Sequence, residues 1–434
     1  MNERHSGELH RALGLGALTI YGIGDILGAG IYALIGKVAA VSGHQSWISF
    51  AGALFVAALT ALSYAELVGR YPRSGSESYF VRQAFPSPAL GLFVGWLVFC
   101  SGVVSTATVS HAFSGYFASL VPGAPAVGLI VVFLLLISAI NYLGIRQSSS
   151  VNMFCTAVEV SGLALVLYAG WSYLGGDAAR ELSPSDSSVS WPDLAEGSVL
   201  AFYAFIGFED MVNIAEEVKS PRKTLPRAIV TALIVAGSLY MLVSGMATTV
   251  VPVDVLAASE APLLEVVRRG APAIPPTLFT VIALLAVANT GLLNFVTGSR
   301  LLYGMSRQGL LPPWLGAVHS TRRTPHHAIV AILLVTLLLA LSGTLVFLAG
   351  TTSFLLLTVF FAVNSSLVVI KLKTKPEPVP DTFQVPLPIP AAGAVSALGL
   401  LFFVPLRALL TAAILSILGL AVVLARKSRP ADQT

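Results

Sequence analysis

Charged side chains are scarce in this chain, and their scarcity excludes an ordinary water-soluble protein. Only 11% of the 434 residues are Asp, Glu, Lys or Arg, while 56% are hydrophobic. A soluble domain usually has about a quarter of its residues charged. We therefore predict that most of the chain lies in lipid.

Common catalytic and metal-binding patterns are also missing. The seven histidines are scattered without metal-ligand spacing. Both cysteines, Cys100 and Cys155, fall inside apolar runs, which favours packing as small hydrophobic residues over pairing. The sequence has no phosphate-cradling loop, nucleophile elbow or ATPase module. We expect no metal, no cofactor and no enzymatic activity.

Long apolar runs are abundant. Each is about 20 residues or more, enough to cross the roughly 30 Å hydrocarbon layer as a helix. The runs are continuously apolar, which favours helices over the alternating strands of a barrel, and the first is too long for a cleaved signal peptide. We predict an all-α polytopic membrane protein with twelve transmembrane helices, at about residues 14–38, 46–69, 88–119, 124–142, 150–173, 197–217, 228–249, 277–304, 327–343, 347–371, 387–404 and 406–425.

The distribution of Lys and Arg predicts the orientation. With alternate loops assigned to the cytoplasm, starting at the N-terminus, 20 of the 25 basic residues lie inside. This bias is the positive-inside rule, and it places both termini in the cytoplasm of a cell-membrane protein. The net charge of +4 then reflects topology and gives no reason to expect a nucleic-acid partner. Five basic residues are left outside: Lys37, Arg180, Arg268, Arg269 and Arg407.

Two spans are interrupted at corresponding places. The stretch G-I-G-D-I-L-G-A-G-I at 22–31 lies in span 1, and F-Y-A-F-I-G-F-E-D at 202–210 lies in span 6, five spans later. Discontinuous helices at matching positions of two inverted repeats are typical of a transporter site. We predict these parts: a tail at 1–13, a first repeat at 14–175, a polar outer loop at 176–196, a second repeat at 197–375, a Pro-rich linker at 376–386, and two extra spans with a short tail at 387–434. The other long outer loop, at 250–276, is interpreted as ordinary polar surface.

The first interruption is a candidate anion site. Its glycines let the backbone leave helical geometry, and the amides at the start of the second half-helix suit a carboxylate, while freed carbonyls suit an ammonium group or a cation. The plainer interpretation is that Gly24-x-x-x-Gly28 is only a close-packing motif.

The second interruption places Gly207 beside Glu209 and Asp210, and Tyr203 and Phe205 flank it. A carboxyl group at membrane depth needs a cavity, a partner or a proton path. We choose Glu209 as the functional carboxyl and interpret Asp210 as bonding a neighbouring helix.

Two further carboxyl groups, Asp25 and Glu159, lie within apolar sequence. Burial disfavours the ionised form, so such a group can load a proton on one side and release it on the other; paired closely, two could instead bind Na⁺. On span 8, Asn289, Thr290 and Asn294 offer neutral oxygens for a cation or a polar substrate, although bonds between helices are the commoner use.

Four stretches resemble the amino acid permeases of the amino acid, polyamine and organocation (APC) superfamily. They are G-D-I-L-G-A-G-I-Y at 24–32, Y-A-E-L-V-G-R-Y-P-R-S-G-S at 64–76, the segment from F-I-G-F-E-D to L-P-R-A-I at 205–229, and R-L-L-Y-G-M-S-R-Q-G-L-L-P at 300–312. The resemblance covers essentially the whole chain. It implies a LeuT-type fold of two inverted five-helix repeats, with spans 1 and 6 unwound around the substrate.

The same resemblance implies roles for single residues. Amides of Gly28, Ala29 and Gly30 would hold the substrate carboxylate, and carbonyls near Ile26, Tyr203 and Ile206 would take its amino group. Tyr203 would be an aromatic gate, Asn294 a pocket residue and Glu209 a proton-linked carboxyl. Two positions depart from the family: Ala29 replaces a frequent Ser or Thr, and Glu159 stands where proton-coupled relatives often have Lys.

We predict alternating-access transport of an amino acid or related amine, with proton coupling through Asp25, Glu159, Glu209 and Thr290. The first alternative is Na⁺-coupled symport, using Gly24, Leu27, Asn289 and Thr290, with Glu159 as an optional further ligand; the second is strict exchange. Two alternatives belong to other functional classes. A membrane enzyme would need a cluster of reactive residues, and a solute sensor would need a soluble output domain; the sequence shows neither.

Overall fold

A computed structural model describes residues 13–71, 76–144, 149–175, 189–213, 215, 218–307, 311–322, 324–373 and 383–427. These residues are nearly all helical, and no strand occurs among them; the one β-bridge joins Leu13 to Val218. The helices are α1 Leu15–Ile26, α2 Ala29–Ser42, α3 Ser46–Arg70, α4 Ser76–Ala84, α5 Pro88–Leu120, α6 Ala126–Leu143, α7 Ser149–Leu174, α8 Trp191–Phe202, α9 Asp210–Asn213, α10 Pro221–Val250, α11 Val253–Ala258, α12 Pro262–Gly270, α13 Pro276–Arg307, α14 His326–Ser342, α15 Leu345–Lys373, α16 Pro388–Leu401 and α17 Leu406–Lys427. Short 3₁₀ turns are η1 Gly43–Gln45, η3 Tyr203–Phe205 and η5 Pro313–Gly316.

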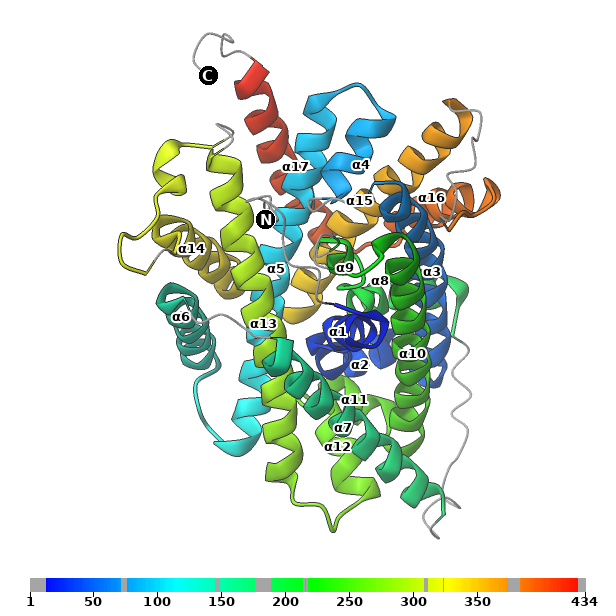
Figure 1. Cartoon of the computed structure of the whole chain (residues 1–434). Helices are drawn as coiled ribbons and strands as arrows, with labels where there is room; N and C mark the ends of the chain where they lie inside the picture. Colours follow the sequence, from blue (N-terminus) through cyan, green and yellow to red (C-terminus); the bar gives the residue numbers. More distant parts are fainter. Residues whose placement is uncertain are drawn as a thin grey trace, which may run out of the picture.

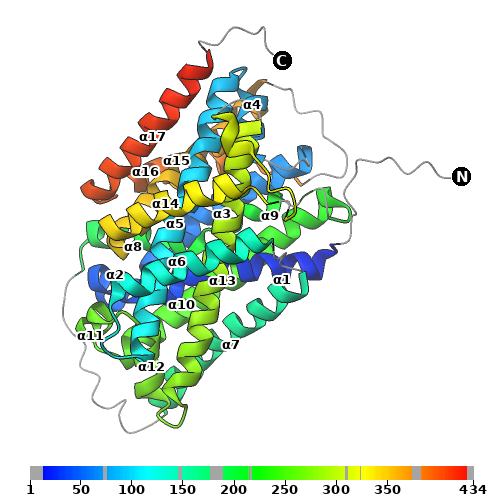
Figure 2. The same cartoon turned by 90° about the vertical axis from the view of Figure 1, so that its left-hand side faces the viewer.

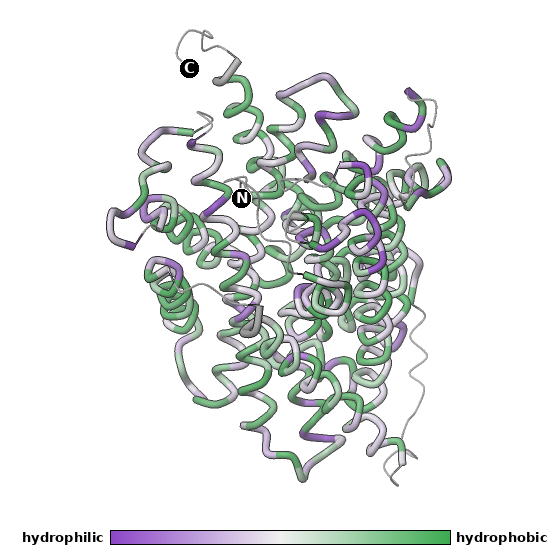
Figure 3. Tube along the Cα trace, in the orientation of Figure 1, coloured by the Kyte–Doolittle hydropathy of each residue, from purple (hydrophilic) through white to green (hydrophobic). Residues whose placement is uncertain are grey.

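The helices agree with a polytopic membrane protein. Eight segments are long and apolar enough to cross a membrane, and three shorter apolar helices, α1, α14 and α16, accompany them. Apolar residues predominate along the long helices, while hydrophilic residues gather at many turns (Figure 3). The predicted positions of the apolar runs are close to those of the helices, but the number of twelve crossings and the inverted repeats stay predictions.

The helix pair α1 and α2 lies in the middle of the molecule. α10 packs along α1 and α3, and α8 packs against α2 and α3 (Figure 1). In the view turned by 90°, α1 and α2 follow one another across the centre of the molecule (Figure 2). An interruption in this pair therefore lies among surrounding helices, where irregular backbone is tolerated at membrane depth.

The segment 250–276 is not the polar surface loop that we predicted. It contains α11 and α12, whose apolar residues Leu256, Leu263 and Val267 are fully buried. α11 packs on α2, and α12 packs on α7. The prediction was wrong because the polar residues of this segment are spaced so that each short helix keeps an apolar face for its neighbours.

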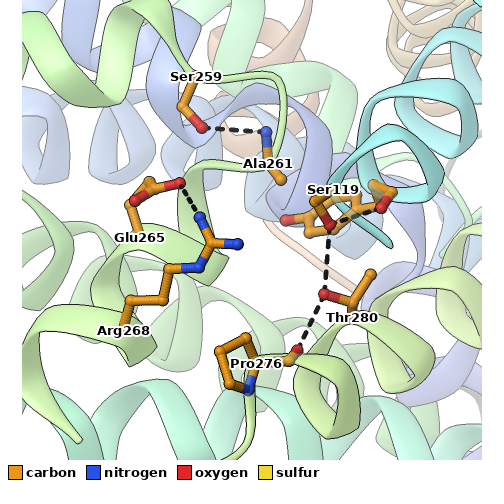
Figure 4. A network of polar contacts seen from close by, with 8 residues as sticks. Ser119, Ser259, Ala261, Glu265, Arg268, Pro276 and Thr280 are labelled. Atoms are coloured by element: carbon orange, nitrogen blue, oxygen red, sulfur yellow. Dashed lines mark hydrogen bonds and ion pairs between the residues drawn. The ribbon is translucent and has the colours of Figure 1, made fainter. Parts of the chain in front are cut away.

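Polar contacts hold the ends of neighbouring helices near α12. The hydroxyls of Ser119 on α5 and Thr280 on α13 lie 3.4 Å apart, and Thr280 also donates to the Pro276 carbonyl (Figure 4). On α12 itself, Arg268 pairs with Glu265 at 3.1 Å. The end of α5 is thereby tied to the start of α13.

A buried ionic cluster lies at another part of the bundle. The Glu66 carboxylate on α3 is fully buried and accepts from Arg70 at 2.6 Å and from Lys371 on α15 at 2.7 Å. Its second oxygen accepts from the Val385 amide, just before α16. Two cations and an amide compensate this buried charge, which explains the Glu and Arg of the 64–70 stretch as a structural pair. Most of the predicted linker at 376–386 lies outside the described residues.

Candidate functional site

The first helix interruption is at Leu27 and Gly28. α1 ends at Ile26, and α2 begins at Ala29 with Gly28 as its N-cap residue at φ −54°, ψ −147°. The non-helical residues thus begin one position before the predicted Gly28-Ala29-Gly30 stretch, so Ala29 and Gly30 form the first turn of α2. A first helical turn presents amides without partners in their own helix, together with the positive end of the helix dipole.

The second interruption follows α8. The chain passes through η3, is extended at Ile206 and reaches Gly207 at φ +126° before α9 starts at Asp210. Only glycine adopts this backbone region at low cost. The Gly207 amide donates to the Glu209 carboxylate at 3.0 Å. The Glu209 side chain therefore caps the backbone of the break in which it lies.

The two interruptions pack directly on one another. A Cβ added to Gly207 would lie 2.6 Å from the Asp25 carbonyl oxygen, and one added to Gly30 would lie 2.5 Å from the Cα of Ala204. No side chain fits at either place, so glycine is required by space at Gly30 and by both space and φ at Gly207. Close backbone contact brings the ends of four helical segments to one point.

A small cavity lies at this contact and is partly open to solvent. Its lining residues come from both interruptions and from two long helices, α5 and α13. They are Gly24, Asp25, Ile26, Gly28, Ala29, Gly30, Ser105, Tyr203, Ala204, Ile206, Gly207, Asp210, Thr290, Leu293 and Asn294.

Most of the residues predicted from sequence line this cavity, and some do not. Phe205, Leu27, Glu159, Glu209 and Asn289 lie outside the lining. The Phe205 ring instead contacts the Tyr240 ring edge to face, at 5.1 Å between ring centroids. Four lining residues were not predicted as site residues from the sequence: Ser105, Ala204, Asp210 and Leu293; the expectation for Asp210 was a bond to a neighbouring helix.

A polar cluster forms one wall of the cavity. The Ser105 hydroxyl on α5 lies 2.8 Å from the Tyr203 hydroxyl and accepts from the Asn294 amide at 2.9 Å. The three side chains come from α5, η3 and α13, so tertiary packing alone brings them together. The one available signal for Ser105 was the small polar run S-T-A-T-V-S at 105–110 inside an apolar span.

Thr290 holds the start of α2. Its hydroxyl accepts from the Ala29 amide at 2.9 Å and donates to the Ala286 carbonyl at 3.2 Å. A Cβ on Gly28 would collide with the same hydroxyl oxygen. The Ala29 amide is thus already occupied, which leaves the lining residues Gly28 and Gly30 as the candidate amide donors at the start of this turn.

The carboxyl groups have different surroundings. Asp25 Oδ2 is buried without a hydrogen-bond partner in the part of the chain that the structure describes, and Asp25 lines the cavity. Glu159 is fully buried; its Oε1 accepts from Asn289 at 3.2 Å, while Oε2 has no partner among the described residues. Within those same residues, no Lys or Arg forms a salt bridge with Asp25, Glu159 or Glu209.

Residues 13–424 match the family model described as amino acid permease. The chain belongs to this family. Its relatives are amino acid permeases and transporters of the APC superfamily, so the permease is a multi-pass membrane protein of the transporter class.

Among its relatives is the branched-chain amino acid permease BcaP of Bacillus subtilis (strain 168), 30% identical over 74% of this chain and 73% of the relative. The methylthioribose transporter of the same organism is 30% identical over 74% and 72%. Cationic amino acid transporter 3, mitochondrial, of Arabidopsis thaliana is 28% identical over 87% and 65%. The permease is similar to each of them over most of its length.

Proposed function

We propose that the permease carries an amino acid or a related amine across the cell membrane by alternating access, coupled to protons. The observation that carries this proposal is the cavity between the two helix breaks, because it combines amide donors at a helix start with the Asp25 carboxyl, whose Oδ2 has no hydrogen-bond partner among the described residues. An α-amino acid needs an anion site and a cation site side by side.

The proposed pose follows from the cavity groups that have no hydrogen-bond partner among the described residues. The substrate carboxylate lies at the amides of Gly28 and Gly30, and the ammonium group lies at Asp25. The Ile26 carbonyl is already bound by Tyr240, so we assign it a secondary role. The substrate side chain then points to the wall of Ser105, Leu293 and Asn294, which carries no formal charge.

The relatives are named for branched-chain amino acids, for cationic amino acids and for methylthioribose. These names support an amine or another small polar solute as the substrate. The uncharged wall favours neutral amino acids over cationic ones. A thermal-shift screen of the purified permease tests this choice: leucine and valine should stabilise it more than lysine or putrescine. Stabilisation by lysine alone would reverse the assignment.

Proton coupling is proposed from Glu159 and Glu209, because Asp25 takes the substrate ammonium group in this pose, and neither of the two is neutralised by a basic residue in the described part of the chain. A carboxyl without a cation partner at this depth is stable when protonated. Sodium coupling remains the alternative, with the Gly24 carbonyl and Thr290 on the cavity wall as oxygen ligands.

Uptake into proteoliposomes separates the three modes. With substrate outside only, an inward proton gradient should drive accumulation in sodium-free buffer. Accumulation that requires Na⁺ and ignores the pH gradient would overturn proton coupling. No net uptake without internal substrate, with rapid counterflow when it is present, would identify an exchanger.

A further inference from the structure

Tyr240 on α10 is hydrogen-bonded to both interrupted helices. Its hydroxyl contacts the carbonyl of Ile26, the last residue of α1, and lies 2.9 Å from the carbonyl of Ala204 in η3. One phenol thereby connects the backbone of two segments that lie far apart in sequence.

The Tyr240 hydroxyl has one proton to donate but two carbonyl acceptors beside it. A phenol has one proton and donates one strong hydrogen bond, whereas two carbonyl oxygens approach the same oxygen atom. Both carbonyls lie at the C-terminal ends of helical segments, where carbonyl groups lack donors in their own helix. At any moment one of the two is satisfied by the phenol, and the other needs a second donor.

The phenol is held in a fixed place. The Tyr240 side chain is fully buried, and its ring packs against Phe205 at 5.1 Å and against Phe50 on α3 at 5.9 Å between centroids. Tyr240 itself does not line the cavity, whereas Ile26 and Ala204 both do. The hydroxyl therefore acts on the cavity only through the backbone that it binds.

We propose that Tyr240 is a positioning residue that couples the two helix breaks through its single hydroxyl proton. The proton bonds the Ile26 carbonyl or the Ala204 carbonyl, and the carbonyl that it leaves turns to a donor in the cavity. This inference rests on the proposed function for the identity of that donor, the substrate ammonium group. The connection between the breaks does not depend on it.

Tyr240→Phe tests the connection without any substrate. We expect amide hydrogen exchange to accelerate in both breaks at once, over 24–31 and 203–210, because each loses the same donor. Tyr116→Phe is the matched control: Tyr116 is also fully buried and donates to one carbonyl, that of Tyr32 on α2. The control should leave the second break unchanged.

Binding gives the second readout. Tyr240→Phe should weaken the binding of the substrate that stabilises the wild type by about tenfold, the size expected for one lost hydrogen bond at a buried site. The unfolding temperature without substrate should fall no further than in Tyr116→Phe. A merely structural role would leave the affinity unchanged, however far the unfolding temperature falls.

Failure of the connection between the breaks can be distinguished from failure of the proposed function. Faster exchange in one break only, or in neither, overturns the coupling whatever the substrate is. Faster exchange in both breaks of a permease that binds no amino acid or amine supports the connection and refutes the proposed function. If Tyr240→Phe does not fold, the wild type serves instead: amides over 24–31 and over 203–210 should exchange with one opening free energy and the same denaturant dependence, and two different values would overturn the inference.

Discussion

The Thr290 hydroxyl accepts a hydrogen bond from the Ala29 amide at 2.9 Å, across 261 positions of sequence. One side chain of α13 thereby fixes where α2 begins. The same oxygen would collide with any side chain at position 28, so Gly28 and Thr290 depend on one another. The start of α2 is the predicted carboxylate site, and its geometry is set from outside its own helix.

Thr290→Val should therefore weaken transport. Valine keeps the shape of threonine and removes the acceptor of the Ala29 amide, so the first turn of α2 loses its anchor. We expect the KM for uptake to rise by about tenfold, the effect of one buried hydrogen bond. Thr290→Ser should restore most of the affinity. Thr248→Val is the control, because Thr248 bonds only within its own helix; equal KM values for the two valine variants would contradict the prediction.

Gly207→Ala should disrupt the contact between the breaks. Alanine at φ +126° is strained, and its Cβ would press on the Asp25 carbonyl. We expect transport to be lost and the free energy of unfolding to fall by about 2 kcal/mol. Gly245→Ala on α10 is the control, since a Cβ there meets nothing within 4 Å. Uptake and denaturation measurements on both variants check this, and wild-type uptake by Gly207→Ala would refute it.

Glu209→Gln should separate charge from backbone capping. The amide oxygen of glutamine can still accept from the Gly207 amide, so the break keeps its geometry while the ionisable group is removed. Uptake driven by a pH gradient should weaken, and exchange should be partly retained. Glu209→Leu, which removes the acceptor as well, should lose both. If uptake keeps its pH dependence in Glu209→Gln, Glu209 has no coupling role.

Ser105→Ala should change substrate preference. The Ser105 hydroxyl joins Tyr203 and Asn294, so alanine leaves both without this partner and makes the wall more apolar. We expect the ratio of affinities to shift toward larger aliphatic side chains by several-fold, within the range for one methyl-sized change. Ser101→Ala on the same helix is the control, because Ser101 bonds its own helix at Val98. Competition uptake with a set of amino acids would show an unchanged ranking if Ser105 plays no part.

Glu77→Gln should alter how stability depends on pH. Glu77 lies on α4, outside the candidate membrane spans; burial raises its pKa to about 7, Asp210 adds to the rise, and hydrogen bonds from its own amide and from Tyr64 oppose it. An unfolded Glu titrates near about pH 4.3. Between these values the folded state holds one proton more than the unfolded chain, so the free energy of unfolding falls as pH rises and levels off above the folded pKa.

Glutamine removes this titration. The unfolding temperature of Glu77→Gln should fall less than that of the wild type between about pH 5 and about pH 8, with a difference of up to about 3 kcal/mol in the free energy of unfolding. Glu260→Gln is the control, because the Glu260 side chain is 63% exposed. A wild-type pH profile in Glu77→Gln would show that the buried carboxyl does not titrate in this range.

The sequence by itself determined the lipid environment, the positions of the apolar helices and the two places where helices fail. Hydrophobicity and the conformational freedom of glycine are local properties, so 56% hydrophobic residues and the glycines at 24, 28, 30 and 207 carry that information directly. Eleven residues predicted from the sequence line the cavity: nine belong to the two breaks, and Thr290 and Asn294 belong to α13.

Only the tertiary structure decided which other side chains meet there. A membrane helix is apolar on nearly every side, so its sequence does not reveal which face lies toward the centre. Ser105, Asp210 and Leu293 reach the cavity, and Tyr240 reaches both breaks, because packing turns those faces inward. Glu159 and Glu209 are carboxyl residues in apolar sequence just as Asp25 is, yet neither lines the cavity. Contact with the cavity depends on how each segment is packed and turned, which its composition does not determine.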